Sequence, residues 1–250
     1  MEFGICNLGI IPLRKEPNHK SELISEILYG ETFTITQASI DWIKISLSWD
    51  DYEGWINKNQ FQILSFNDFK KVNTENPKYV TNLFEYISLE NSQLFPICIG
   101  SNVSASKFLN HNHKWIESRS NTSTRELIIK TTFRYLHTPY LWGGKSPFGI
   151  DCSGLAQMVY KINGIKIKRD AWQQAEQGIT LSFIDESEQG DLAFFDDEEG
   201  GIIHVGILLK NNRIIHSHGK VRIDKIDQTG IFNSEKNTYS HKLRIIKKIF

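Results

Sequence analysis

The sequence predicts an α+β protein in which a small all-β barrel precedes a larger domain built from a helix packed on an antiparallel sheet. Short, alternating apolar runs fill residues 1–64, whereas helical spacing and then a hairpin pattern follow after residue 121. The chain has 250 residues, of which 40% are hydrophobic, so it can bury substantial cores. We therefore expect an ordered chain with more than one folded unit.

The predicted barrel, residues 1–64, depends on three runs of β-favouring residues. These runs are "TFTITQ" (Thr32–Gln37), "WIKISLS" (Trp42–Ser48) and "EGWINKNQF" (Glu53–Phe61). Turn-like "SID" and "SWDDYEG" separate them, which is the pattern of strands joined by tight turns. Strands this short at this spacing are typical of a small barrel.

Residues 65–120 mix short apolar pieces with polar loops, and the pattern there is weaker. The stretch "HNHKWIESRSNTST" is rich in Asn, Ser and Thr, a composition typical of connections. We expect a degenerate second β-module followed by a linker.

Residues 121–250 begin with a helix signal. Thr124 is a candidate N-cap and Glu126 stands in the first turn of an apolar run with helical spacing. A glycine-rich loop, "WGGKSPFG", comes next. A second helix is predicted after it, because one helical face would collect Leu155, Met158, Val159 and Ile162.

Charge and cysteine content exclude several partners. The 29 basic and 29 acidic residues cancel, which indicates neither a nucleic-acid footprint nor a membrane-binding stripe. Three widely spaced cysteines argue against a disulfide framework and favour a reducing compartment. The N-terminus lacks the basic and apolar segments of a secretory signal, so the expected location is cytoplasmic.

Cys152 stands at the predicted start of the second helix. Unpaired backbone N–H groups and the helix dipole favour negative charge at such a position, so we expect a stabilised thiolate. Gly143 and Gly144 before it and Gly154 after it leave room for a substrate to approach the backbone. The N–H of Cys152 or Ser153 could then stabilise an oxyanion.

A thiol nucleophile needs a base and a group that orients the base. The segment "GGIIHVGILLKNNRIIHSHG" predicts a hairpin that carries His204 on one strand and His216 on the next. An even, two-residue turn would place these histidines on opposite faces of the sheet. We predict the odd register that pairs Gly206 with His216 and brings His204 and His216 onto one face.

A zinc site is the alternative use of the same residues. Cys152, His204 and His216 form a ligand set known from catalytic zinc centres. The helix start suits a nucleophile better, so we expect neither a metal nor another cofactor, and metal analysis would separate the two readings.

The motifs "PYLWGGKSPFGIDCSGL", "GDLAFF", "HVGILL" and "IIHSHG" resemble successive signatures of the NlpC-type papain-like cysteine peptidases, which cleave bacterial cell-wall peptides. The resemblance covers residues 124 to 250. It implies a papain-like fold, with Cys152 as nucleophile, His204 as general base and His216 as the orienting third residue.

Further positions match the same family one by one. The resemblance implies that the Tyr140 hydroxyl lies beside the oxyanion and that Asp151 and Ser153 contact the substrate. In "RDAWQQAEQG", Asp170 becomes a candidate substrate contact. The family often has serine at the next position, whereas Ala171 offers only its backbone.

The N-terminal barrel resembles a bacterial SH3-like domain, whose usual ending is a Gly-Trp pair, here Gly54 and Trp55. Such a barrel before this peptidase domain is similar to the γ-D-glutamyl-L-diamino acid endopeptidases, in which the barrel restricts the groove to peptides with a free N-terminal L-alanine. Glu22 and Tyr52 are the candidate contacts. The alternatives are a general cell-wall hydrolase or amidase of the same class, and a wall-binding protein without activity.

Overall fold

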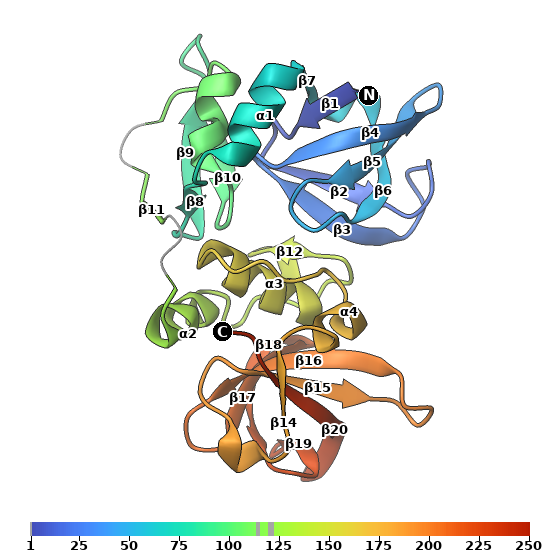
Figure 1. The fold of residues 1–250 in the computed structure, drawn as a ribbon, viewed down its shortest axis with the longest axis vertical. Helices are drawn as coiled ribbons and strands as arrows, with labels where there is room; N and C mark the ends of the chain where they lie inside the picture. The colour runs from blue at the N-terminus through green and yellow to red at the C-terminus, as the bar shows by residue number, and fades with distance from the viewer. Residues whose placement is uncertain (1, 114–115, 120–122) are drawn as a thin grey trace.

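The computed structural model describes residues 2–113, 116–119 and 123–250. An all-β part at the N-terminus and a sheet at the C-terminus lie on either side of a layer of helices (Figure 1). The α+β fold class is therefore as predicted. The expected linker falls partly on residues 114–115 and 120–122, which lie outside the described residues.

The N-terminal strands form an antiparallel sheet in the order β3-β2-β6-β5-β4-β1-β7. Ile43 and Ile45 point inward and pack with Ile11, Leu13 and Phe33 in one apolar core, which confirms the alternation seen in the sequence. The elements are β1 (Glu2–Ile5), β2 (Ile10–Arg14), β3 (Leu23–Leu28), β4 (Thr32–Ala38), β5 (Trp42–Leu47), β6 (Glu53–Asn57), the 3-10 turn η1 (Lys58–Gln60) and β7 (Gln62–Leu64).

The middle segment is packed on the barrel rather than extended away from it. Val72, Val80 and Ile97 share a core with Ile5 and Tyr29 of the N-terminal part. Whether this segment is a degenerate SH3-like module stays a prediction. Its elements are α1 (Phe66–Thr74), β8 (Tyr79–Val80), β9 (Phe84–Ser88), β10 (Leu94–Cys98), η2 (Val103–Phe108) and β11 (Ser118–Arg119).

The helical layer begins where the sequence predicts it. Thr124 caps α2 by accepting the Leu127 N–H at 3.2 Å. The apolar face of α3 packs on the C-terminal sheet, and Leu28 and Ile99 join the same core from the N-terminal side. The N-terminal part therefore contributes side chains to the core beneath the helices. The elements are α2 (Arg125–Arg134), β12 (Lys145–Ser146), β13 (Gly149–Ile150), α3 (Cys152–Ile162) and α4 (Ala171–Ala175).

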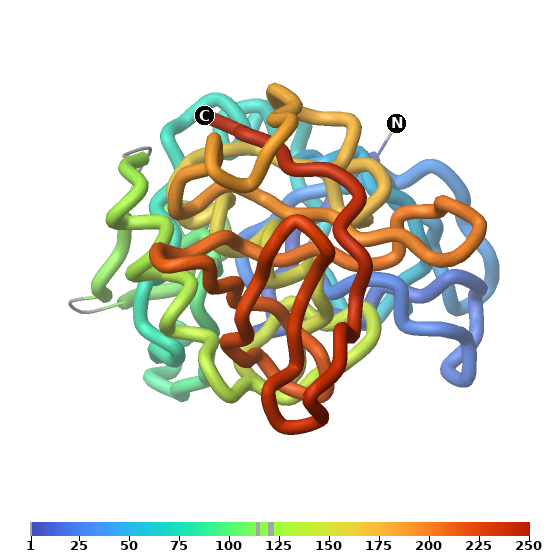
Figure 2. Tube along the Cα trace, turned by 90° about the horizontal axis from the view of Figure 1, so that it is seen from below, coloured from blue at the N-terminus to red at the C-terminus, as the bar shows by residue number. Residues whose placement is uncertain are grey.

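The C-terminal sheet closes on itself through its last strand. β20 pairs with β19 through Thr238–Lys242 and with β15 through Lys242–Lys247. Figure 2 shows the red β19–β20 segment crossing the front of this region. The strands are β14 (Ile179–Leu181), β15 (Leu192–Asp196), β16 (Ile202–Leu209), β17 (Arg213–His218), β18 (Lys220–Ile226), β19 (Gly230–Asn233) and β20 (Thr238–Lys248), with η3 (Ile184–Glu186) between β14 and β15.

Closure gives the sheet an outer face and an inner face. Val205 and Ile207 of β16 point outward to the α3 core, whereas Leu208 points inward with Phe195 and Ile214. Side chains alternate along a strand, so His204 belongs to the inner set together with Leu208. The histidines therefore lie inside the closed sheet, and α3 approaches from outside.

Candidate active site

The helix that carries Cys152 is capped by the residue before it. The Asp151 carboxylate accepts the Gly154 N–H at 2.6 Å and the Gly143 N–H at 2.8 Å. Cys152 is consequently the first residue of α3, as predicted, and its side chain is mostly buried. This geometry fixes the sulfur at one end of the helix.

The glycines around Cys152 serve chain packing rather than substrate entry. A Cβ on Gly154 would lie 2.4 Å from the Gly144 carbonyl oxygen, and one on Gly143 would lie 2.3 Å from the Leu23 carbonyl oxygen. Gly143 also has φ +77°, in the left-handed region. The expectation of open space for a substrate is therefore wrong at these positions, because protein backbone fills it.

The β16–β17 hairpin has the predicted odd register. Gly206 pairs with His216, and Leu209 pairs with Arg213, so three residues form the turn. Asn211 and Asn212 in this turn have φ values of 61° and 53°. This register brings His204 and His216 onto one face, with His204 Nε2 and His216 Nδ1 2.8 Å apart.

A carboxylate that the sequence reasoning missed lies behind His216. Asp224 Oδ2 on β18 is 3.0 Å from His216 Nε2. Although burial raises the pKa of Asp224, the hydrogen bonds from His216 and Arg222 outweigh it and lower that pKa to about 2. The sequence did contain a signal for Asp224. Because β17 and β18 are joined at Gly219, the alternation of side chains puts Asp224 on the same face of the sheet as His216.

Burial works against the predicted thiolate at Cys152. Burial, and then the Asp151 charge, raise the pKa of Cys152 to about 12, although the backbone N–H groups of Val205 and Ser153 lower it. Burial likewise holds the pKa of His204 well below its usual range. Desolvation therefore opposes the helix end and favours a neutral thiol and a neutral imidazole.

The contact with the Val205 N–H also locates the sulfur. Val205 follows His204 directly on β16, and its N–H lies close enough to the Cys152 sulfur to affect the pKa of the thiol. The Cys152 sulfur therefore lies beside the strand that carries His204.

His241 is a second residue that the sequence reasoning missed. Its ring stacks on His204, with centroids 4.2 Å apart and planes 22° apart, and burial lowers the pKa of His241 to about 4. Ligand atoms of His204, His216 and His241 lie within 4.8 Å of one another. A metal fits them poorly, because stacked rings do not point their lone pairs at one atom and both nitrogens of His216 are already engaged.

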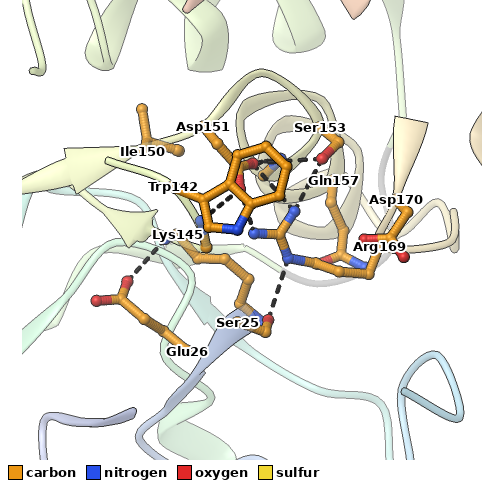
Figure 3. A network of polar contacts seen from close by, with 12 residues as sticks. Ser25, Glu26, Trp142, Lys145, Ile150, Asp151, Ser153, Gln157, Arg169 and Asp170 are labelled. Atoms are coloured by element: carbon orange, nitrogen blue, oxygen red, sulfur yellow. Dashed lines mark hydrogen bonds and ion pairs between the residues drawn. The ribbon is translucent and has the colours of Figure 1, made fainter. Parts of the chain in front are cut away.

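Arg169 ties this site to the N-terminal barrel (Figure 3). Its guanidinium donates to both oxygens of Asp151, at 3.0 and 2.6 Å, and to Ser153 Oγ at 2.9 Å. Its Nε donates to Ser25 Oγ of β3 at 3.1 Å. The predicted substrate contacts of Asp151 and Ser153 stay predictions, and here both side chains hold the start of α3.

The predicted specificity residues lie where the barrel meets the helices. The Tyr52 hydroxyl donates to Asp170 Oδ1 at 3.0 Å and contacts Oδ2 at 3.2 Å. Asp170 directly precedes α4, whose first residue, Ala171, is buried. The side chain of Gln174 in α4 donates to the Ser153 carbonyl at 3.0 Å, which holds α4 beside the start of α3.

Glu22 is exposed, and its expected contact with the substrate stays a prediction. Its carboxylate pairs with Lys15 at 3.0 Å and accepts the Trp142 indole N–H at 2.8 Å. Trp142 belongs to the loop before Cys152, so Glu22 borders the site without being enclosed by it. A charge pair there is screened by water and worth little.

Tyr140 lies in the electrostatic neighbourhood of the sulfur. Burial, and then the Cys152 charge, raise the pKa of Tyr140 to about 12, so its hydroxyl stays protonated at neutral pH. A protonated phenol can donate a hydrogen bond to an oxyanion. Its predicted role beside that oxyanion stays a prediction.

A helix-borne thiol beside a histidine pair on an antiparallel sheet defines a papain-like cysteine peptidase site. Residues 137–239 match the NlpC/P60 family, and residues 13–61 match the bacterial dipeptidyl-peptidase Sh3 domain. The chain carries an NlpC/P60 domain behind a bacterial SH3 domain, and it is a cysteine peptidase.

Curated relatives resemble the chain over most of its length. It is 29% identical over 218 residues to a γ-D-glutamyl-L-lysine dipeptidyl-peptidase from Bacillus subtilis, covering 77% of this chain and 71% of that one. It is 28% identical over 250 residues to dipeptidyl-peptidase 6 from Lysinibacillus sphaericus, covering 86% and 89%.

A solved structure shares the whole fold. The crystal structure of an NlpC/P60 family protein from Bacillus cereus superposes with a TM-score of 0.80 at 18% identity, over 99% of both chains. Among the residues described here, no helix is long and apolar enough to cross a membrane.

Proposed function

We propose that this peptidase cleaves the bond between γ-D-glutamate and a diamino acid in cell-wall peptides that carry a free N-terminal L-alanine. The observation that carries the proposal is the Tyr52–Asp170 hydrogen bond, which places a half-buried carboxylate where the barrel meets the α3 start. An α-ammonium is the complementary group. The similarity to a γ-D-glutamyl-L-lysine dipeptidyl-peptidase supports the same substrate class.

The proposed reaction begins with transfer of the Cys152 proton to His204 as the sulfur attacks the γ-carbonyl carbon. The resulting oxyanion accepts hydrogen bonds from the Cys152 or Ser153 N–H and from the Tyr140 hydroxyl. His204 returns the proton to the leaving amine, and a thioester remains on the sulfur. Water, deprotonated by His204, then releases L-Ala-γ-D-Glu and regenerates the thiol.

We place this activity in the recycling of wall peptides inside the cell, because intact wall carries its L-alanine in amide linkage and that alanine offers no free α-ammonium. The chemistry needs no metal or other cofactor. The partner is then a small peptide rather than nucleic acid or membrane.

Digestion of a defined mixture tests the proposal. The mixture holds free L-Ala-γ-D-Glu-diamino acid peptide and purified intact cell wall, and mass spectrometry identifies the products. Release of L-Ala-γ-D-Glu from the free peptide alone supports the proposal. Release of peptides from intact wall at a similar rate would identify a general cell-wall hydrolase or amidase. Release from neither substrate would contradict the proposed substrate class.

A further inference from the structure

The hydrogen-bonded chain behind Cys152 does not end at its predicted third member. His216 is bonded at both ring nitrogens, through Nδ1 to His204 and through Nε2 to Asp224. Asp224 is itself largely buried and receives two hydrogen bonds from Arg222, at 2.7 Å to Oδ2 and 2.9 Å to Oδ1. Three side chains, Asp224, His216 and His204, are thus hydrogen-bonded in series, and Cys152 lies beside the strand that carries His204.

The chemistry of Asp224 determines which nitrogen carries each proton. An ionised carboxylate only accepts hydrogen bonds, so His216 donates to it through Nε2–H. A neutral His216 then has its lone pair on Nδ1 and can only accept from His204. His204 therefore carries its proton on Nε2, and its Nδ1 lone pair is left free for the thiol proton.

The opposite set of protons would disable the base. If His216 carried its proton on Nδ1, it would donate to His204 Nε2, and His204 would have to carry its own proton on Nδ1. Both ends of the His204–His216 hydrogen bond are imidazoles, so that pair alone does not favour either arrangement. A group outside the pair therefore has to determine which arrangement of protons forms.

We propose that Asp224 is a positioning residue of this peptidase, whose acceptor-only carboxylate fixes the tautomers of His216 and His204 so that His204 keeps a free lone pair for Cys152. This inference rests on the proposed role of His204 as the base. It concerns a residue that the sequence motifs leave out.

The first test reads the tautomers directly in the wild-type protein. Nitrogen-15 NMR of histidine-labelled protein at neutral pH distinguishes Nε2–H from Nδ1–H, and His→Gln variants assign the signals. We expect a single Nε2–H form for both His204 and His216. An Nδ1–H form of His204 would overturn the inference, and this result needs no substrate.

The second test changes Asp224→Asn, which keeps the shape but adds an N–H donor. Arg222 donates to both carboxylate oxygens of Asp224, so the NH2 group of the new asparagine faces an Arg222 N–H in either orientation of the amide. Neither orientation is then favoured, and we expect His216 to populate both tautomers. We expect mixed histidine signals and a fall in kcat of about 10- to 100-fold with KM within about twofold. The loss should be smaller than the roughly 10⁴-fold seen when a carboxylate touches the base directly.

Two further variants control the result. Asp227→Asn replaces a carboxylate by an amide just beyond β18, where the Asp227 carboxylate accepts a hydrogen bond from the Tyr239 hydroxyl rather than from a histidine of the site. This variant should leave kcat and the histidine signals unchanged. Asp224→Glu restores an acceptor-only group and should restore one tautomer.

Three outcomes would overturn the inference: wild-type kcat in Asp224→Asn, a loss of kcat without a change of tautomer, or mixed tautomers in Asp224→Glu. If the wild-type tautomers are as expected but the peptide is not cleaved, the proposed function alone fails.

Discussion

The Tyr52 hydroxyl donates a hydrogen bond to the Asp170 carboxylate at 3.0 Å, although the two residues lie 118 positions apart in the chain. Tyr52 comes from the N-terminal barrel, and Asp170 precedes the short helix α4. Burial raises the pKa of Asp170, while Tyr52 and Arg169 act against that rise. A half-buried carboxylate held in this way is ready for a cationic partner.

Replacing Tyr52→Phe removes the donor and leaves the Asp170 carboxylate less fixed. We expect kcat/KM for the free peptide to fall about tenfold, or ~1.4 kcal/mol, mainly through KM, because the bond positions a binding group. Tyr239→Phe is the matched control, since it removes a Tyr–Asp bond to Asp227, outside the site. Equal kinetics for the two variants would contradict the assignment.

Replacing Cys152→Ala should abolish peptide cleavage, because no other group at the α3 start can form the thioester. Residual turnover should lie below about a thousandth of wild type, roughly what binding and an oxyanion hole alone retain. Cys98→Ala removes another buried thiol and should keep near-wild-type turnover. Higher residual activity in the Cys152 variant would show that the nucleophile lies elsewhere.

The two histidines should differ in their effect on turnover. His204→Ala removes the base and should lower kcat on the order of 10³-fold or more, whereas His216→Ala, which removes the orienting group, should lower it less. Steady-state kinetics with both variants measure the difference. Slight losses of kcat of similar size in both variants would contradict the assignment of His204 as the base and His216 as the residue that orients it.

The resting state of Cys152 can be read from its alkylation rate. Because burial raises the pKa of this thiol to about 12, the thiolate fraction should rise about tenfold for each pH unit between pH 7 and 10. Iodoacetamide labelling of Cys152, followed by mass spectrometry, should rise in parallel. A plateau that begins below pH 7 would instead indicate a preformed thiolate–imidazolium pair.

Local signals in the sequence were sufficient to predict the helices and the hairpin that carry the site. The cap at Thr124 and the start of α3 at Cys152 follow from local spacing, whereas the odd hairpin register was predicted because it puts His204 and His216 on one face. The first two could be predicted because each depends on contacts that are short in sequence.

What could not be predicted depends on closure of the sheet and on burial. His241 reaches His204 only because β20 pairs with both β19 and β15, and nothing in "TYSHKLRIIKK" signals that pairing. Helix-end stabilisation of the Cys152 thiolate was visible in the sequence, whereas the opposing desolvation was not. The exposure of Glu22, at a strand end of the barrel, could not be read from the sequence either.

The measurement that tests the central claim most directly is kcat/KM for L-Ala-γ-D-Glu-diamino acid and for its N-acetylated form, in wild type and Asp170→Asn. Acetylation removes the charge that Asp170 would meet, so wild type should prefer the free peptide by at least about 30-fold, or ~2 kcal/mol. Asp170→Asn should lose most of this preference, while Glu22→Gln, at an exposed carboxylate, should lose little. Equal rates for both peptides in the wild-type enzyme would contradict a groove gated by the barrel and would favour a general wall hydrolase.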